Sequence, residues 1–152
     1  MKYLTRHFSL EEFLFSQTAA RRGIDNTPDE IAMIHLLTTA QSMEEVRALL
    51  GNPIKITSGY RSQALNSAIG GANTSAHMEG WAADFICPGF GRPIEIVREI
   101  AASPIRFDQC IQEGNWVHIS FAPANRRQLL TAHFGPEGTT YSRGVSESVT
   151  HG

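Results

Sequence analysis

The chain has 152 residues, of which 41% are hydrophobic, and 13 Lys and Arg against 15 Asp and Glu give a net charge of −2. This length suits one compact domain, and the balanced charge argues against nucleic acid or an anionic membrane surface as a partner. No segment reaches the length and apolarity of a membrane span, and two cysteines are too few for a disulfide scaffold.

Capping signals predict two helices in the first third of the chain. Ser9-Leu10-Glu11-Glu12 is a capping box, which should open a short helix that ends near Ala20. Thr27-Pro28-Asp29-Glu30 is a second one, with proline at the first helical position, and Gly51 should end this helix after Leu50. Apolar residues cover more than one stripe of the second helix, so we expect it to be the main helix packed on a sheet.

The following residues predict a small sheet with two further helices. Apolar runs and breakers indicate strands at 54–57, 81–87, 107–112 and 116–121, and helices at 63–69 and 93–102. Glu113-Gly114-Asn115 is a hairpin signal between the last two strands. We therefore expect an α+β fold, in which helices pack on a small, mostly antiparallel sheet whose other face stays open.

The C-terminal residues have a different composition. After about Phe134 the chain is rich in Gly, Ser, Thr and charged residues. This composition favours a loosely held tail over residues 135–152, after a single domain at 1–134.

Two strands carry polar residues that need partners. Asp84 interrupts the apolar run 81–87, and a carboxylate in a core is costly unless it is compensated, for example by a metal ion. In the run 116–121, alternation places Trp116, His118 and Ser120 on one side. If the two strands are neighbours, Asp84 and His118 can converge.

His77 supplies a third donor. It lies in a loop, Gly70 to Gly80, rich in Gly, Asn, Thr and Ser, which can fold back over a sheet. Two imidazoles and one carboxylate suit a catalytic zinc ion with an open position for water, which predicts a hydrolase. The same set also forms the facial triad of non-haem iron oxygenases, which remains an alternative. The other four histidines lack such a context and are expected to be surface or packing residues: His7, His35, His133 and His151.

A family resemblance runs through these residues. Ser75, His77, Gly80, Ala82 and Asp84 match the S-x-H-x-x-G-x-A-x-D motif of the zinc D-alanyl-D-alanine carboxypeptidases and L-alanyl-D-glutamate endopeptidases of peptidoglycan. The run 116–120 matches the second motif of that family, which supplies the third ligand. The resemblance extends to 57–62, 8–13 and 23–28 and covers roughly residues 5 to 135. Small single-domain members resemble bacteriophage endolysins.

The resemblance implies roles for the site residues. His77, Asp84 and His118 would hold Zn²⁺, and the stem peptide of peptidoglycan would be the substrate. Arg61 would hold a substrate carboxylate, which a guanidinium matches with two parallel hydrogen bonds. Ser75 would bind substrate or cap its loop.

The general base is the point where the chain departs from the family pattern. Related peptidases place an acidic residue three positions before the last histidine ligand, and Asn115 stands there. Glu113, at the hairpin tip, is the preferred candidate, and Asp108 is the reserve.

These observations predict a zinc metallopeptidase that cuts peptidoglycan stem peptides, with the L-Ala-D-Glu bond favoured. The alternatives are a D-Ala-D-Ala carboxypeptidase and a metal-containing module that binds cell wall or protein without turnover. The first seven residues lack the apolar core of a signal peptide. We therefore expect cytoplasmic synthesis, release to the bacterial wall by a separate membrane protein, no membrane insertion, and a monomer.

Overall fold

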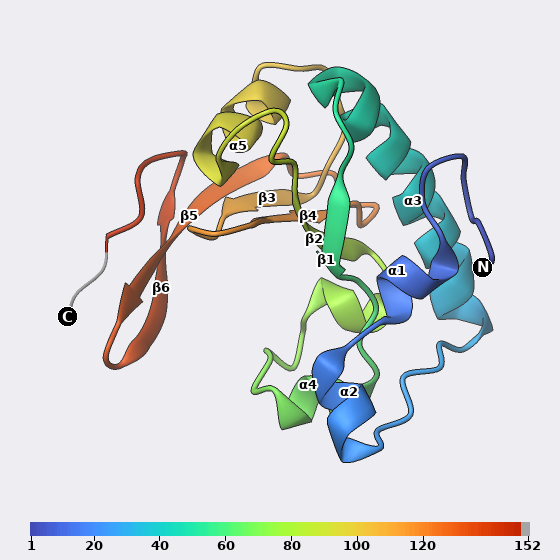
Figure 1. The fold of residues 1–152 in the computed structure, drawn as a ribbon. Coiled ribbons are helices and arrows are strands. Elements are labelled where there is room, and N and C mark those ends of the chain that lie inside the picture. The colour runs from blue at the N-terminus through green and yellow to red at the C-terminus, as the bar shows by residue number, and fades with distance from the viewer. Residues whose placement is uncertain (150–152) are drawn as a thin grey trace.

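The computed structural model describes residues 1–149 as a single sheet with helices on both of its sides (Figure 1). The helices are α1 (Leu10–Leu14), α2 (Gln17–Arg22), α3 (Glu30–Leu50), α4 (Gln63–Ala68), the 3-10 helix η1 (Ala76–Glu79) and α5 (Pro93–Ala101). The strands are β1 (Lys55–Ser58), β2 (Ala82–Ile86), β3 (Gln109–Gln112), β4 (Val117–Ser120), β5 (Gln128–Gly135) and β6 (Gly138–Arg143). The prediction of an α+β fold is confirmed at this level.

The sheet is larger and more mixed than the sequence predicts. Its six strands lie in the order β1-β2-β4-β3-β5-β6, and β3 pairs with β5 in parallel while the other four pairings are antiparallel. The expectation of a small, mostly antiparallel sheet is thus corrected, because β5 and β6 extend the sheet beyond the four predicted strands.

The C-terminal residues form part of this sheet. Strand β6 lies at Gly138–Arg143, and Gln112 Nε2 donates to the carbonyl oxygen of Ser146 at 2.9 Å. The prediction of a loosely held tail from Gly135 is therefore wrong for these residues, because the backbone of β6 pairs with that of β5. Residues 150–152 of the expected tail lie outside the described part of the chain.

Two details of the predicted helices also differ. The helix expected to run from Leu10 to Ala20 is divided into α1 and α2, since Ser16 starts a new helix by accepting from the Ala19 backbone N–H at 3.2 Å. Helix α3 begins two residues later than expected: Asp29 is its N-cap, and Pro28 precedes the helix. The capping box of Ser9 and Glu12 is confirmed.

The hydrophobic core lies between α3, α5 and one face of the sheet. Alternate strand residues such as Phe85, Val117 and Ile119 are fully buried there, together with Leu36 and Ile100 from the helices. Both cysteines are buried free thiols, as the sequence predicts. The residues between these positions along each strand must point to the opposite face, which the long helices do not cover. In residues 1–149 no helix is long and apolar enough to cross a membrane.

Candidate metal centre

The register of the sheet brings Asp84 and His118 together on its open face. Asp84 on β2 pairs directly with His118 on β4, and Ser58 on β1 pairs with Asp84 from the other side. The neighbours Ala83 and Phe85 point into the core, so Asp84 points away from it. His118 Nδ1 lies 2.9 Å from Asp84 Oδ1. The predicted convergence of the two strands is confirmed.

His77 reaches the same point from η1. The Ser75 side chain caps this helix by accepting from the His77 backbone N–H at 3.3 Å. The His77 ring is 2% exposed, and its Nε2 lies 3.2 Å from Asp84 Oδ1. The loop that carries His77 therefore does fold back over the sheet, as expected.

The backbone of Gly59 fixes the orientation of the His77 ring. His77 Nδ1 lies 2.6 Å from the Gly59 carbonyl oxygen, and a carbonyl only accepts, so Nδ1 carries the proton. Gly59 itself has no room for a side chain, because a Cβ there would lie 2.5 Å from the Phe13 carbonyl oxygen. The nitrogen that faces Asp84 is consequently Nε2, and a backbone contact of this kind is the usual support of a metal-binding histidine.

The charges of the three residues suit a cation. Burial lowers the pKa of His77 and so favours the neutral ring. Burial alone would raise the pKa of Asp84, but the adjacent His77 and His118 rings outweigh it and hold the pKa below its ordinary value. A neutral His77 presents a lone pair to the Asp84 oxygen, and two acceptors at this distance repel unless a proton or a metal ion lies between them.

The donor atoms of His77, Asp84 and His118 all lie within 4.8 Å of one another. Two imidazole nitrogens and one carboxylate oxygen are a set that zinc accepts with a further position open, and non-haem iron accepts it too. The residues therefore fit a single transition-metal ion.

Arg61 lies in the cleft beside these donors. Its backbone N–H donates to the His77 carbonyl oxygen at 3.0 Å, and its Nη2 donates to Ser75 Oγ at 3.1 Å. Within residues 1–149, the buried Nε has no hydrogen-bond partner. Burial lowers the pKa of this guanidinium, and the charge of Asp84 partly opposes the shift. A guanidinium that is held in place and has an unused N–H can bind a carboxylate by donating a hydrogen bond to it.

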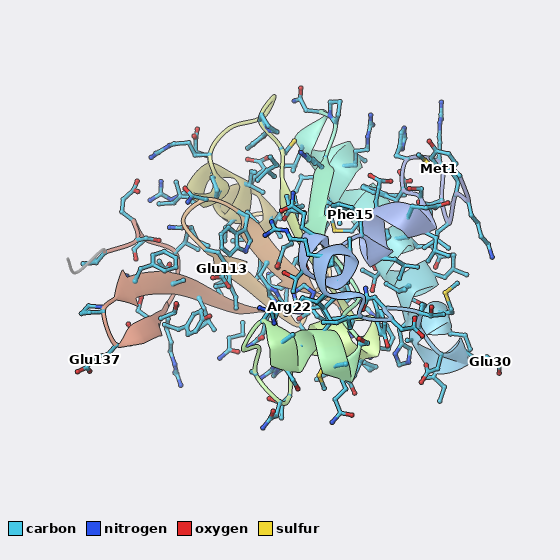
Figure 2. All side chains as sticks on the ribbon, turned by 60° about the horizontal axis from the view of Figure 1, so that its bottom comes forward. Met1, Phe15, Arg22, Glu30, Glu113 and Glu137 are labelled. Carbon is cyan, nitrogen blue, oxygen red and sulfur yellow. The ribbon has the colours of Figure 1, made fainter. Side chains whose placement is uncertain are left out.

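The cleft itself has a volume of about 860 Å³ and includes the predicted base. Glu113 is half-buried at the end of β3, and burial raises its pKa, with His118 opposing and Asp84 adding to the shift. Among residues 1–149 its carboxylate has no hydrogen-bond partner. Figure 2 shows Glu113 beside the hairpin of β5 and β6, whose tip carries Glu137.

Asp108 also lines the cleft, but its carboxylate is already engaged. Arg126 donates from Nε to Oδ1 at 2.9 Å and from Nη2 to Oδ2 at 2.8 Å, and the Arg126 backbone N–H adds a third bond at 3.1 Å. These hydrogen bonds hold the pKa of Asp108 below its usual range. Asn115, which stands at the position of the family's acid, is exposed and does not line the cleft.

Sequence reasoning missed one wall of the cleft. Leu130 and Phe134 of β5 and Thr139 and Tyr141 of β6 line it. Thr139 and Tyr141 belong to the tail that was expected to be loosely held, and no strand was predicted for Leu130 and Phe134. The available signal was the turn sequence Gly135-Pro136-Glu137-Gly138 between two short runs with β-branched and aromatic residues.

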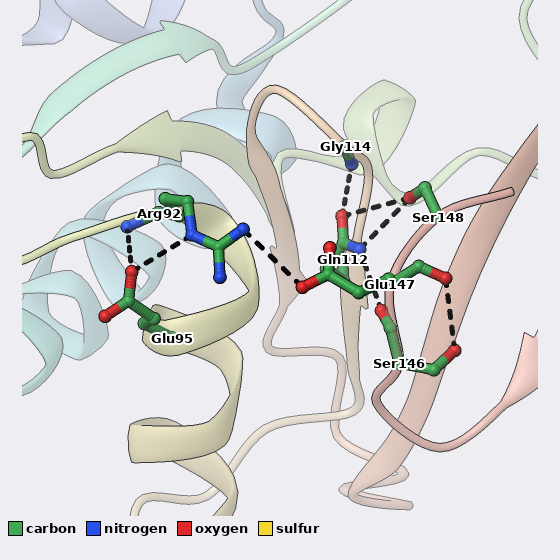
Figure 3. A network of polar contacts seen from close by, with 7 residues as sticks. All are labelled: Arg92, Glu95, Gln112, Gly114, Ser146, Glu147 and Ser148. Carbon is green, nitrogen blue, oxygen red and sulfur yellow. Dashed lines mark hydrogen bonds and ion pairs between the residues drawn. The ribbon is translucent and has the colours of Figure 1, made fainter. Parts of the chain in front are cut away.

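A buried amide ties the turn that follows Glu113 to the end of the described chain (Figure 3). Gln112 is 2% exposed; its Oε1 accepts from the Gly114 backbone N–H, and its Nε2 donates to Ser148 Oγ at 3.0 Å. Arg92 forms an ion pair with Glu147 at 3.5 Å from the other side. The position of the turn therefore depends on residues that follow it by more than thirty places.

Comparison with known proteins adds two findings. A family model described as peptidase M15 matches residues 6–120. A zinc D-Ala-D-Ala carboxypeptidase of Streptomyces albus G is 41% identical over 54 residues, which are 35% of this chain and 21% of that protein. The chain thus spans about a fifth of the length of this curated relative.

Proposed function

Because the chain belongs to the peptidase M15 family, we propose that it is a zinc-dependent peptidase that hydrolyses a peptide bond in the stem peptides of peptidoglycan. The observation that carries the proposal is the cluster of His77, Asp84 and His118 at the floor of a cleft that also holds a fixed arginine. The similarity to a protein named as a zinc D-Ala-D-Ala carboxypeptidase supports both the metal and the substrate class.

In this proposal His77, Asp84 and His118 hold the zinc ion. Zinc, when bound, supplies Lewis acidity that polarises a substrate carbonyl and makes water a better nucleophile at neutral pH. Glu113 takes a proton from the attacking water and passes it to the nitrogen of the leaving amine. Its freedom from hydrogen-bond partners within residues 1–149 and its raised pKa support this role over Asp108, which Arg126 engages.

Arg61 binds a carboxylate on the C-terminal side of the cleaved bond, and Ser75 orients the guanidinium through its contact with Nη2. The unused Nε of Arg61 offers a second donor to the same carboxylate. A peptide held at this carboxylate can place its carbonyl over the three donors.

We favour the L-alanyl-D-glutamyl bond as the target, with an endolysin-like role in lysis of the bacterial wall, because a cut near the glycan strand severs crosslinks. The second candidate is removal of the terminal D-alanine, which the name of the Streptomyces relative favours. Both bonds have a free carboxylate on their C-terminal side, which Arg61 can bind.

Digestion of purified peptidoglycan at near-neutral pH tests the proposal. Mass spectrometry should detect stem peptides with a new amino-terminal glutamate and intact glycan strands, and a chelator should abolish their release. Loss of a terminal D-alanine alone would move the assignment to the carboxypeptidase. Unchanged peptidoglycan with zinc in excess would overturn catalysis and favour a metal-containing binding module.

A further inference from the structure

The hairpin of β5 and β6 forms a side of the cleft that the family match does not include. Residues 128–143 follow the matched segment 6–120. In the pairing of the two strands, Phe134 lies opposite Thr139, and Ala132 lies opposite Tyr141. Leu130, Phe134, Thr139 and Tyr141 line the cleft, so one face of the hairpin is turned toward the site.

This hairpin is held in place by the residues around it. The buried Thr131 donates from Oγ1 to the Gly144 carbonyl oxygen at 2.8 Å, and Thr131 Oγ1 accepts from the Ser146 backbone N–H at 3.0 Å. The Phe134 ring lies against Gly114, because a Cβ on Gly114 would come within 3.0 Å of it. The hairpin is therefore a fixed wall next to the turn that follows Glu113.

The order of the strands places the hairpin relative to Arg61, Asp84 and His118. Arg61 follows β1 at one edge of the sheet, β2 and β4 carry Asp84 and His118, and β6 is the opposite edge. A peptide with its carboxylate at Arg61 and its cleaved bond over Asp84 and His118 would lie across β2 and β4. The rest of such a peptide would extend over β3 toward the hairpin, because β3 and β5 follow β4 in the sheet.

We propose that the β5–β6 hairpin binds the part of the substrate on the N-terminal side of the cleaved bond, with Tyr141 and Phe134 as contact residues. The inference rests on the proposed function, in which Arg61 takes the carboxylate on the C-terminal side. For the L-alanyl-D-glutamyl bond, the part that reaches the hairpin is L-alanine with the muramyl sugar attached to it.

The chemistry of the wall suits this ligand. Aromatic rings offer broad apolar faces to the methyl group of alanine and to the C–H face of a sugar. Tyr141 is 52% exposed and so has surface free for contact. Burial, with the charges of Glu113 and Asp84, raises the pKa of Tyr141, so the phenol stays protonated and can donate to a sugar oxygen or a carbonyl.

Kinetics on two substrates test the inference. One is a stem peptide attached to muramic acid, and the other is the same peptide without the sugar. Tyr141→Ala should raise KM for the sugar-bearing peptide about tenfold, the usual scale of an aromatic contact, with kcat and zinc content unchanged. The effect on the sugar-free peptide should be smaller, and Phe134→Ala should act in the same direction.

Thr140→Ala is the matched control, because Thr140 is exposed on the same strand and does not line the cleft. If the wild type cuts both peptides and Tyr141→Ala behaves like Thr140→Ala, the inference is overturned and the proposed function stands. If Tyr141→Ala lowers kcat and leaves KM unchanged, binding by the wall is also overturned. A wild type that cuts neither peptide would overturn the proposed function, and this inference with it.

Discussion

Asp84 and His118 are direct partners across β2 and β4, with 2.9 Å between Oδ1 and Nδ1. A slip of one residue in this register would turn one of the two side chains toward the helix-covered face, because side chains alternate along a strand. The backbone hydrogen bonds of the sheet therefore fix the positions of Asp84 and His118 without the help of a metal ion. Only His77 depends on a helical turn and its loop.

The first prediction concerns the metal. His77→Ala, Asp84→Ala and His118→Ala should each lose most of the zinc, which the intact protein should hold at about one ion per chain, as the three-ligand site implies. Metal analysis of the dialysed proteins measures this, with His7→Ala as control because His7 pairs with Glu44 outside the cleft. Stoichiometric iron in the purified protein, or full zinc content in all three variants, would contradict the assignment.

The second prediction concerns the base. Glu113→Gln should lower kcat by about 100-fold to 10,000-fold, the usual contribution of general acid-base catalysis, while zinc stays bound. Because Glu113 is not among the three clustered donors, metal content is the internal control. Asp108→Asn should lower kcat much less. The reverse ranking of the two variants would move the base to Asp108.

Arg61 is predicted to act in substrate binding. Arg61→Ala should raise KM by the equivalent of about 1.5 to 3 kcal/mol, the usual value of a hydrogen bond to a charged group. Arg61→Lys should recover only part of the loss, because an ammonium cannot form two parallel bonds to a carboxylate. Steady-state kinetics measure both, with Arg98→Ala on the exposed side of α5 as control. A large fall in kcat at unchanged KM would contradict a binding role.

The ion pair of Asp108 and Arg126 predicts a pH dependence of stability. The pKa of Asp108 is lower in the folded protein than in the unfolded chain, so the pair stabilises the fold above the unfolded value of about 3.9. This contribution is lost as the pH falls through the lower, folded pKa. Asp108→Asn should reduce the free energy of unfolding at pH near 7 by about 1.5 to 3 kcal/mol.

Urea unfolding of both proteins at neutral and acidic pH measures the difference. The gap between wild type and Asp108→Asn should narrow as the acid protonates the wild-type carboxyl group. An equal gap at both pH values would show that the carboxylate charge is not the source.

Gln112 is predicted to stabilise the turn that follows Glu113. Gln112→Ala removes the acceptor of the partly buried Gly114 N–H and should lower the free energy of unfolding by about 1 to 3 kcal/mol. The Gly114 amide should exchange its hydrogen faster, which mass spectrometry after deuterium labelling detects. Gln63→Ala on the exposed surface of α4 is the control. Unchanged protection of the turn would contradict the coupling that Figure 3 displays.

Two residues of the candidate metal centre were predictable because each carries a local signal. Asp84 interrupts an apolar run, and His118 alternates with core residues, so both signals lie within a few residues of sequence. The break between α1 and α2 has a partly tertiary origin. The Phe13 carbonyl oxygen accepts from the Tyr60 N–H, and the Leu14 carbonyl oxygen accepts from Asn26 Nδ2, and no local pattern reports either contact.

Strand β6 was missed for a different reason. Five of its six residues are exposed, so it shows no alternation of apolar and polar side chains. Its backbone partners lie on β5, the other strand of the same hairpin, and β5 in turn pairs in parallel with β3. The pairing of β5 with β3 is non-local and leaves little trace in a single sequence, so the turn at 135–138 was the one local signal of this hairpin.

Gly59, which has no side chain, contributes to the candidate metal centre through the contact of its carbonyl oxygen with His77. Any larger residue at position 59 would push against the Phe13 backbone and displace the oxygen that aims the imidazole. A genetic screen for inactive variants should therefore recover Gly59 alongside the three donors. A comparison of functional groups alone would overlook it.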